Sequence, residues 1–222
     1  YGKVALVTGG SRGLGRQAAL ALAREGVHVA ICARVPGALA DTRLEIEQLG
    51  VSAAALEADM ADSGAPAAAV QAVEQQLGPI DILVNNVGGS LGTSDVLESS
   101  EDDFARVFGL NLWSALRLMK RTAPGMRERG WGRIINIASI YGREHGGPAP
   151  YMAAKASMIA VSKHLAISLA KDGVTVNAIA PGSILHEQGS WERFVESNTK
   201  EFVDEFIDRN MPMGRFGWPE PI

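Results

Sequence analysis

The sequence predicts a single α/β domain in which helices cover both faces of a doubly wound parallel sheet. Short apolar runs alternate with amphipathic stretches of helical composition along most of the chain. Neighbouring parallel strands need long connections that return over the face of the sheet, and helices usually supply them. The apolar runs are continuous rather than alternating with polar residues, as expected for strands buried on both faces. Ligands are then expected at the carboxyl ends of the strands.

Strands are expected where short runs rich in Val, Ile and Leu occur, because these side chains suit buried sheet positions. Gly26 and Gly50 mark the points where a preceding helix ends and the chain turns toward the next run. The predicted strands are 4–7, 27–32, 52–57, 80–84, 133–138 and 174–179.

Helices are expected in the longer stretches between these runs, which are amphipathic or rich in Ala. Pro66 suits the first turn of a helix, where its missing N–H costs no hydrogen bond. The predicted helices are 17–24, 36–49, 65–77, 101–123 and 151–171.

Residues 183–217 form a tail without an expected strand, in which large apolar residues recur at roughly helical spacing. One interpretation is a surface helix that packs on the core. The other is a mobile cover over a substrate pocket, because the tail directly follows the carboxyl end of a strand. We expect residues 183–217 to be a helical, substrate-covering segment within the single domain 1–222. The apolar residues are Trp191, Phe194, Val195, Phe202, Phe206 and Ile207.

Composition argues against several classes of protein. With 21 basic and 25 acidic residues the formal charge is −4, which does not suit a nucleic-acid binder. The single cysteine, Cys32, excludes an intrachain disulfide, and the scattered acids and histidines predict no metal site. No apolar run reaches the ~18 residues of a membrane span, and no signal-peptide pattern precedes the first strand. We therefore expect a cytoplasmic protein with neither a nucleic-acid nor a membrane partner.

The segment Thr8-Gly-Gly-Ser-Arg-Gly-Leu-Gly15 lies between the first strand and the first helix. Gly9, Gly13 and Gly15 leave room where the backbone must turn tightly and approach a pyrophosphate, and the following helix directs its N–H groups at the anion. A turn with helix-capping glycines is the alternative. The position at the first strand–helix junction favours a nucleotide site.

Tyr151 and Lys155 are four residues apart, so they lie on one face of the predicted helix 151–171. Reduction of a carbonyl by hydride needs a proton donor at the nascent alkoxide, and the reverse reaction needs a base there. A free phenol, with a pKa of ~10, is a weak base at neutral pH. A nearby ammonium favours the phenolate. Ser139, at the end of a predicted strand, could hold the substrate oxygen.

Taken in order, these motifs resemble the short-chain dehydrogenases/reductases of the Tyr-x3-Lys type, and 3-oxoacyl-[acyl-carrier-protein] reductases among them. The resemblance covers nearly the whole chain and implies a Rossmann fold. Members normally continue past residues 219–221 with another helix and a final strand, so this chain is expected to lack that strand. The landmarks are Thr8–Gly15, Asp59, Asn85–Gly88, Asn111, Ser139, Tyr151–Lys155 and Pro181–Gly182.

The resemblance implies that Asp59 and Met60 flank the adenine of a dinucleotide, and that residues 86–88 line its ribose while Asn85 ties neighbouring strands together. His186 stands where relatives often have a Thr that contacts the nicotinamide carboxamide. The implied cofactor-binding residues are Gly9, Ser11, Arg12, Gly13, Leu14, Gly15, Arg34, Asp59, Met60, Asn86, Val87, Gly88, Tyr151, Lys155, Pro181, Gly182 and Ile184.

The choice between NAD and NADP depends on the end of the second strand. NAD sites usually place an acid there, which holds the ribose hydroxyls and repels a 2′-phosphate. This chain has Ala33 at that position, followed by Arg34, and Arg12 lies in the glycine-rich segment. Two guanidinium groups could hold a phosphate through charge-assisted hydrogen bonds. The alternative is two solvated surface arginines. The predicted cofactor is NADP(H).

By the same resemblance, Tyr151 is the general acid/base, Lys155 lowers its pKa and holds the nicotinamide ribose, and Ser139 binds the substrate oxygen. Asn111 would place a water for proton relay. Gly109 and Asn111 both have weak helix propensity, which is compatible with a local distortion of the helix that contains them.

The resemblance therefore implies an NADP(H)-dependent oxidoreductase that interconverts a carbonyl and a secondary alcohol on a small-molecule substrate. A 3-oxoacyl thioester is one candidate, and polyol, sugar or xenobiotic carbonyls stay open. One alternative is a non-catalytic NADP(H)-binding sensor or scaffold on the same fold. Another is an epimerase or dehydratase with a resident cofactor. We also expect a homo-oligomer, either a dimer or a tetramer.

Overall fold

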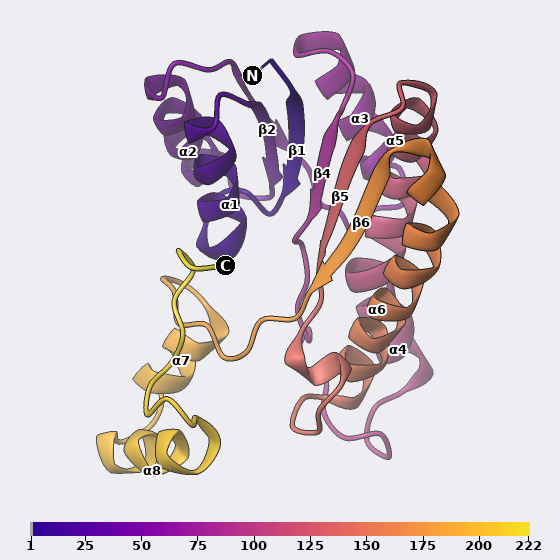
Figure 1. Cartoon of the computed structure of the whole chain (residues 1–222). Coiled ribbons are helices and arrows are strands. Elements are labelled where there is room, and N and C mark those ends of the chain that lie inside the picture. Colours follow the sequence, from indigo (N-terminus) through magenta and orange to yellow (C-terminus); the bar gives the residue numbers. More distant parts are fainter. Residues whose placement is uncertain (1) are drawn as a thin grey trace.

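A computed structural model describes residues 2–222 and contains one six-stranded, fully parallel sheet (Figure 1). The order of the strands across the sheet is β3-β2-β1-β4-β5-β6, so the predicted doubly wound architecture is confirmed. The strands are β1 (Val4–Thr8), β2 (His28–Ala33), β3 (Ala53–Glu57), β4 (Ile82–Asn85), β5 (Gly132–Ile137) and β6 (Val174–Ile179).

Helices pack on both faces of this sheet (Figure 1). One face is covered by α1 (Gly13–Arg24) and α2 (Pro36–Gln48), which enclose a core around Val29, Ile31 and Ile46. The other face is covered by α3 (Ala65–Gln76), α5 (Ser114–Glu128) and α6 (Ala149–Leu169). Two 3-10 turns flank α6, η2 (Ile140–Gly142) before it and η3 (Ala170–Asp172) after it.

The fourth strand begins two residues later than predicted. Ile80 and Asp81 precede it, and the Asp81 carboxylate accepts a hydrogen bond from the backbone N–H of Val4 at 3.2 Å. Asp81 also pairs with Lys3 and Arg129. The side chain of this acid joins the start of β4 to the amino end of β1, and its backbone bonds to Val4 and Arg133 at 2.9 Å each.

The helix predicted over 101–123 is divided by a distortion. It consists of α4 (Glu101–Phe108), a π-helical turn η1 (Gly109–Trp113) and α5. Ser100 begins α4 with a reciprocal capping box to Asp103. The π turn contains the Gly and Asn whose weak propensities indicated a distortion, and such turns frequently occur at functional sites.

The tail forms two short helices, α7 (Ser190–Glu196) and α8 (Lys200–Asn210), below the carboxyl ends of the strands (Figure 1). Their apolar side chains enclose a small core of their own, separate from the cores on the two faces of the sheet. A bridge between Ile184 and Gly217 brings the two ends of the tail together. The first interpretation, a helix packed on the main core, does not describe this arrangement.

A buried polar network joins the central strands to α6. The Asn85 amide donates to Asn136 Oδ1 at 2.7 Å, and the Asn136 amide donates to Ser162 Oγ at 2.8 Å. Asn85 thus ties neighbouring strands together, as predicted. Cys32, Met119 and Met126 are buried, whereas Trp113 is half exposed.

Across residues 2–222 no helix has the length and apolarity needed to cross a membrane. In the same range no group of three or more His, Cys, Asp and Glu side chains is arranged to hold a metal ion.

Candidate active site

The glycine-rich segment lies at the switch point of the sheet, where β1 is flanked by β2 and β4. Gly9 and Gly13 have φ angles of 67° and 52°, in the left-handed region. A β-carbon at Gly15 would stand 2.2 Å from the carbonyl oxygen of Gly9, so only glycine fits there. The first helix begins at Gly13 without a side-chain cap, which leaves its N-terminal N–H groups available to an anion.

Thr8 and Asn86 hold this segment in place. Thr8 Oγ1 accepts hydrogen bonds from the backbone N–H groups of Asn86 and Val87, at 2.9 and 3.1 Å. The Asn86 amide donates to the carbonyl oxygens of Thr8 and Gly9, at 2.9 and 3.3 Å. Asn86 was predicted to line a ribose, but its side chain is engaged with the loop backbone. Sequence reasoning missed the role of Thr8, because a Thr at a strand end has no distinctive signal.

An open pocket of about 430 Å³ lies beside the carboxyl ends of β2 and β3. Arg34, Glu57, Ala58 and Asp59 line it. The Asp59 carboxylate accepts a hydrogen bond from the Ala61 N–H at 3.0 Å, which fixes one of its oxygens. The pocket therefore lies where the resemblance implies the adenosine end of a dinucleotide, and it contains one cation and two acids.

The predicted catalytic residues come together below the carboxyl end of β5. Ser139 follows β5 and begins η2, while Tyr151 and Lys155 lie one turn apart on α6. A β-carbon at Gly142 would lie 2.9 Å from the Lys155 carbonyl carbon, so a glycine lets η2 pack directly on α6. Lys155 Nζ lies 5.6 Å from the centre of the Tyr151 ring.

Asn111 reaches the same place from the π turn. A β-carbon at Gly88 would stand 2.7 Å from Asn111 Oδ1 and 2.9 Å from Lys155 Nζ, so both side chains converge on that glycine. The Asn111 amide donates to the carbonyls of Gly89 and Val107, each at 2.8 Å, and its Oδ1 accepts from Gly89 N at 3.0 Å. Asn111 thereby connects the loop after β4 to the helix that contains it.

The electrostatics of Lys155 are dominated by burial. Its side chain is 2% exposed, and Nζ donates to the carbonyl oxygen of Ile137 at 2.7 Å. Because burial disfavours the charged ammonium, it lowers the pKa of Lys155 to about 8. The lysine is thus held in an environment that makes its charge costly.

The pKa of Tyr151 is shifted upward, whereas Lys155 was predicted to lower it. Burial raises the pKa of the Tyr151 phenol above its ordinary value, and a hydrogen bond with Ser139 acts in the other direction. Tyr141 adds to the rise. The phenol therefore keeps its proton at neutral pH, which suits a proton donor.

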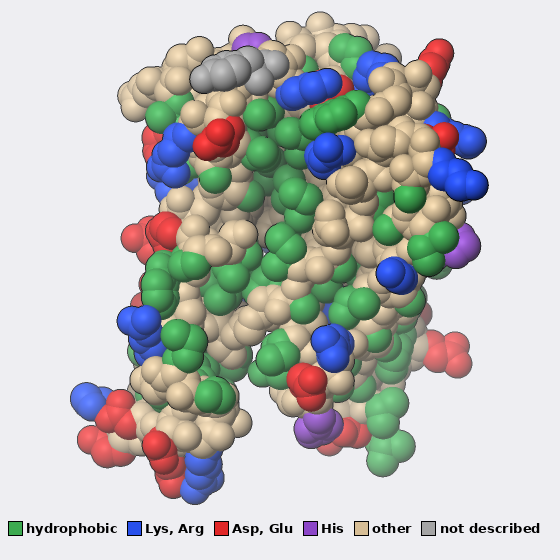
Figure 2. Space-filling model, in the orientation of Figure 1, with side chains coloured by type: hydrophobic (Ala, Val, Ile, Leu, Met, Phe, Trp, Pro, Cys, Tyr) green, Lys and Arg blue, Asp and Glu red, His purple; other side chains and the backbone are tan. Residues whose placement is uncertain are grey.

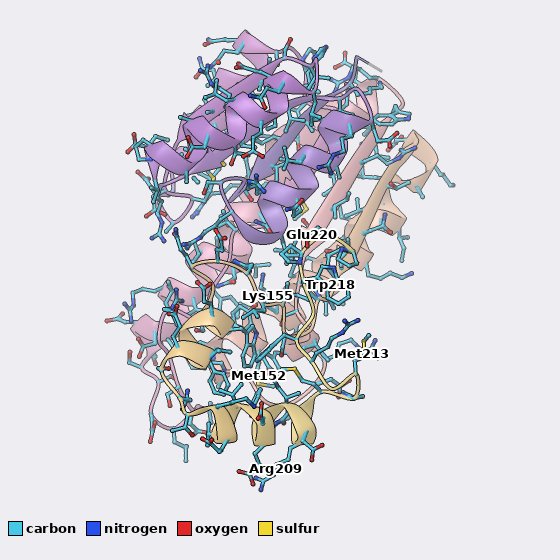
Figure 3. The ribbon with its side chains drawn as sticks, turned by 90° about the vertical axis from the view of Figure 1, so that its left-hand side faces the viewer. Met152, Lys155, Arg209, Met213, Trp218 and Glu220 are labelled. Carbon is cyan, nitrogen blue, oxygen red and sulfur yellow. The ribbon has the colours of Figure 1, made fainter. Side chains whose placement is uncertain are left out.

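The tail encloses the other side of this region. Figure 2 shows a hollow between the tail helices and the lobe that contains α4 and α6, with hydrophobic side chains on both of its sides. Figures 1 and 3 place the segment with Met213 and Trp218 across from the part of α6 that carries Met152 and Lys155. Pro181 is joined to η2, because its carbonyl oxygen accepts from Ile140 N at 2.9 Å.

The remaining predicted cofactor residues lie along the same edge. Ser11 and Leu14 belong to the glycine-rich segment, and the Ser11 carbonyl accepts from Thr42 Oγ1 at 3.5 Å. Met60 is buried beside the pocket that contains Asp59, whereas Gly182 and Ile184 follow β6. Arg12 does not join Arg34 in that pocket, because its guanidinium donates to Gln188 Oε1 at 3.1 Å.

Comparisons with known proteins agree with this geometry. A family model described as short chain dehydrogenase matches residues 3–193. The chain belongs to the short-chain dehydrogenase family. A 3-oxoacyl-[acyl-carrier-protein] reductase of Staphylococcus aureus is 35% identical over 219 residues, with 97% of this chain and 85% of the relative covered.

Two solved structures of this fold carry different cofactors. Actinorhodin polyketide ketoreductase with NADPH, a single-site variant, has a TM-score of 0.89 and 36% identity, with 99% of this chain and 86% of that chain covered. NAD+-bound xylitol dehydrogenase has a TM-score of 0.88 and 33% identity, with 99% and 88% covered. Both support an oxidoreductase fold that binds a nicotinamide cofactor, and they leave the choice of NAD or NADP open.

The residues of this short-chain dehydrogenase fit such a cofactor. The glycine-rich segment leaves space that any β-carbon at Gly15 would fill, and uncapped N–H groups face that space. Lys155 is buried with one hydrogen-bond acceptor for its ammonium, which can donate three hydrogen bonds. The N–H groups of α1 and the Lys155 ammonium can therefore still donate hydrogen bonds on the side where the dinucleotide is expected.

Proposed function

We propose that this chain is an NADP(H)-dependent reductase that interconverts a 3-oxoacyl-type carbonyl and a secondary alcohol. The observation that carries the proposal is a chain of contacts at the carboxyl end of the parallel sheet. Asn111 and Lys155 converge on Gly88, Lys155 lies beside the Tyr151 ring, and Tyr151 is hydrogen-bonded to Ser139. This convergence brings a phenol, a hydroxyl and a buried ammonium to one place beside the glycine-rich segment.

Each of these side chains has a separate task. When bound, the nicotinamide supplies or accepts a hydride at the substrate carbon. Tyr151 donates its proton to the nascent alkoxide, and its raised pKa keeps that proton available at neutral pH. Ser139 donates a hydrogen bond to the same oxygen and stabilises the charge that develops there. Lys155 would hold the nicotinamide ribose, and Asn111 fixes the loop that carries Gly88 and Gly89.

The substrate class is supported by the hydrophobic side chains beside the hollow (Figure 2). Met213, in the tail segment that Figure 3 places across from α6, is 75% exposed, so this apolar side chain is accessible to a ligand. An acyl chain would bury such surface, whereas a sugar would not. The relative named as a 3-oxoacyl-[acyl-carrier-protein] reductase favours the same choice. The name of the similar xylitol dehydrogenase makes a polyol the main alternative substrate class.

The preference for NADP(H) rests on Arg34. It lines the pocket beside β2 and forms no ion pair within the described residues 2–222, so its guanidinium is free to bind a 2′-phosphate. Ala33, at the end of β2, supplies no acid that would hold two ribose hydroxyls. Glu57 and Asp59 in the same pocket act against the phosphate, so the argument depends on this one arginine.

Replacing Arg34 by Asp should shift the ratio of kcat/KM for NADPH and NADH toward NADH by about 10- to 100-fold. The change removes a charge-assisted hydrogen bond worth about 1.5–3 kcal/mol and adds repulsion. Steady-state rates with both cofactors measure the shift. Arg43→Asp, on the exposed side of α2, is the matched control and should leave the ratio unchanged. An unchanged ratio in Arg34→Asp would remove the basis for NADP preference.

The proposed function is tested by following the absorbance of reduced nicotinamide. The full chain is mixed with NADPH or NADH and with 3-oxoacyl thioesters, diketones or ketoses. We expect NADPH to be consumed fastest with the thioesters. Consumption with ketoses alone would overturn the substrate class. NADPH binding without turnover on any carbonyl would favour a sensor or scaffold, and tightly retained cofactor without net consumption would favour an epimerase or dehydratase.

Assembly and location are further parts of the proposal. An apolar groove of about 650 Å³ runs between α5 and α6, and Leu116, Val161 and Leu165 are among its lining residues. Trp113, at the end of η1, is 50% exposed, and Ile167, on α6, is 68% exposed. These features support the predicted homo-oligomer, because large exposed apolar side chains favour association. A cytoplasmic location stays a prediction from the sequence.

A further inference from the structure

His186 lies directly against the glycine-rich segment. Its ring atoms Cε1, Nδ1 and Nε2 lie 2.8–2.9 Å from the point where a β-carbon at Gly13 would stand. The ring also faces Gly189, where a β-carbon would lie 2.9 Å from Cε1 and 3.0 Å from Nε2. The imidazole is therefore packed on bare backbone at the first residue of α1. An anion that reaches the N–H groups of that helix must pass beside the ring.

Residues 186–189 form the turn that carries the ring, and hydrogen bonds connect this turn to the glycine-rich segment. Arg12 Nη1 donates to Gln188 Oε1 at 3.1 Å, although the two residues are 176 positions apart. Arg193 Nη1 donates to the carbonyl oxygen of Gln188 at 2.9 Å, and Gly189 N donates to the carbonyl of His186 at 3.0 Å. Gln188 itself has a φ of 56°, which a non-glycine residue seldom adopts. The position of the ring is thus determined by several contacts.

The hydrogen bond made by the ring defines its tautomer. Nδ1 lies 3.0 Å from the carbonyl oxygen of Glu187, and a carbonyl can only accept, so Nδ1 carries the hydrogen. In the neutral ring, Nε2 then has a lone pair that a phosphate oxygen would repel. Protonation converts Nε2 into an N–H donor with a positive charge. Only the protonated ring can keep its contact with Glu187 and also donate to an anion.

We propose that His186 binds the pyrophosphate of the cofactor in its protonated form, so that dinucleotide binding takes up a proton. This inference rests on the proposed cofactor site. The charged groups around the turn are Arg12 from the glycine-rich segment, Glu187 beside the ring, and Glu192 and Arg193 from α7. Two cations and two acids balance one another, so the charge beside the pyrophosphate depends on the imidazole.

The sign of the effect follows from this linkage. A pyrophosphate beside the ring favours the imidazolium, so the proton is held more tightly in the complex than in the free protein. The extra affinity is present at low pH and is lost as pH rises through the titration of the ring in the complex. A single coupled proton gives at most a tenfold change in affinity per pH unit.

The test uses ADP-ribose, which contains the pyrophosphate but neither the nicotinamide nor a titrating 2′-phosphate. Its dissociation constant for the full chain is measured by calorimetry from pH 5.5 to pH 8.5. We expect binding to be about tenfold tighter at the acidic end, since a charge-assisted hydrogen bond is worth about 1.5–3 kcal/mol. His186→Gln supplies an uncharged donor and should remove the pH dependence below pH 7. The contribution of Lys155, whose pKa is about 8, should persist at the alkaline end in both proteins. His164→Gln, on the exposed face of α6, should keep the original profile.

The outcomes separate this inference from the proposed function. If ADP-ribose fails to bind at any pH, the cofactor site itself is wrong. If it binds with the same pH profile in His186→Gln, the cofactor site stands and the role of His186 is overturned. If NADH shows the His186-dependent profile but ADP-ribose does not, the ring contacts the nicotinamide end, and the assignment to pyrophosphate is wrong.

Discussion

Replacing Tyr151 by Phe is expected to lower kcat by about a thousandfold, within the 10²–10⁴ range typical of general acid–base catalysis, while NADPH still binds. The ring stays in place beside Lys155, so packing changes little, and only the proton on the phenol oxygen is lost. Single-turnover reduction and a separate fluorescence titration of NADPH distinguish loss of chemistry from loss of binding.

Tyr141→Phe provides a matched control for this variant. Tyr141 lies in η2, and its backbone N–H, which the substitution preserves, donates to Ser139 Oγ at 3.2 Å. Its side chain packs on Gly146 and Gly147. We expect kcat to change less than about threefold in Tyr141→Phe, well below the effect of losing a catalytic acid. Retained turnover in Tyr151→Phe would rule out the phenol as the proton donor.

Replacing Lys155 by Met is expected to abolish most turnover and to stabilise the fold. Burial lowers the pKa of Lys155 to about 8. A shift from 10.5 to about 8 corresponds to about 3 kcal/mol at neutral pH. Loss of the hydrogen bond to the Ile137 carbonyl offsets this gain, because it destabilises the variant by about 1 kcal/mol. The net expectation is a gain of about 2 kcal/mol in the free energy of unfolding, with turnover reduced about a hundredfold or more.

The pH dependence of stability tests whether the buried charge of Lys155 causes the stability gain in Lys155→Met. Because the pKa of Lys155 is lower in the folded chain, the unfolded chain binds more protons between pH about 8 and 10.5. Wild-type stability therefore rises with pH in that window, and the advantage of Lys155→Met shrinks. Guanidinium unfolding at pH 7 and pH 10 measures the difference. Lys163→Met, two turns along α6 and exposed, should show neither effect. A destabilised Lys155→Met at pH 7 would contradict the assigned cost of burial.

These two variants illustrate a conflict between stability and function. An ammonium held near Tyr151 and Gly88 is costly to the fold, and its position is explained by binding rather than by packing. The same site contains a phenol whose raised pKa keeps its proton.

Local patterns in the sequence were sufficient to predict the sheet and the glycine-rich segment. Continuous apolar runs specify buried parallel strands, because only strands covered on both faces tolerate them. Gly15 was predictable because its close approach to Gly9 is part of a short local motif. The distortion between α4 and α5 was also indicated, since Gly109 and Asn111 both disfavour a regular helix.

Other features depend on contacts between segments that are distant in the sequence, and only the tertiary structure decided them. Arg12 was predicted to bind a phosphate, but Gln188 supplies its hydrogen-bond partner from 176 residues away. Asn111 meets Lys155 at Gly88 because three separate loops and helices pack together there. The family resemblance placed His186 at the nicotinamide carboxamide. Its position against Gly13 is instead decided by the path of the tail, which depends on the tail's own small core and on the bridge from Ile184 to Gly217. Spacing along the chain determines which side chains lie on the same helix or strand. Tertiary packing determines which helices, strands and loops bring their side chains to one site.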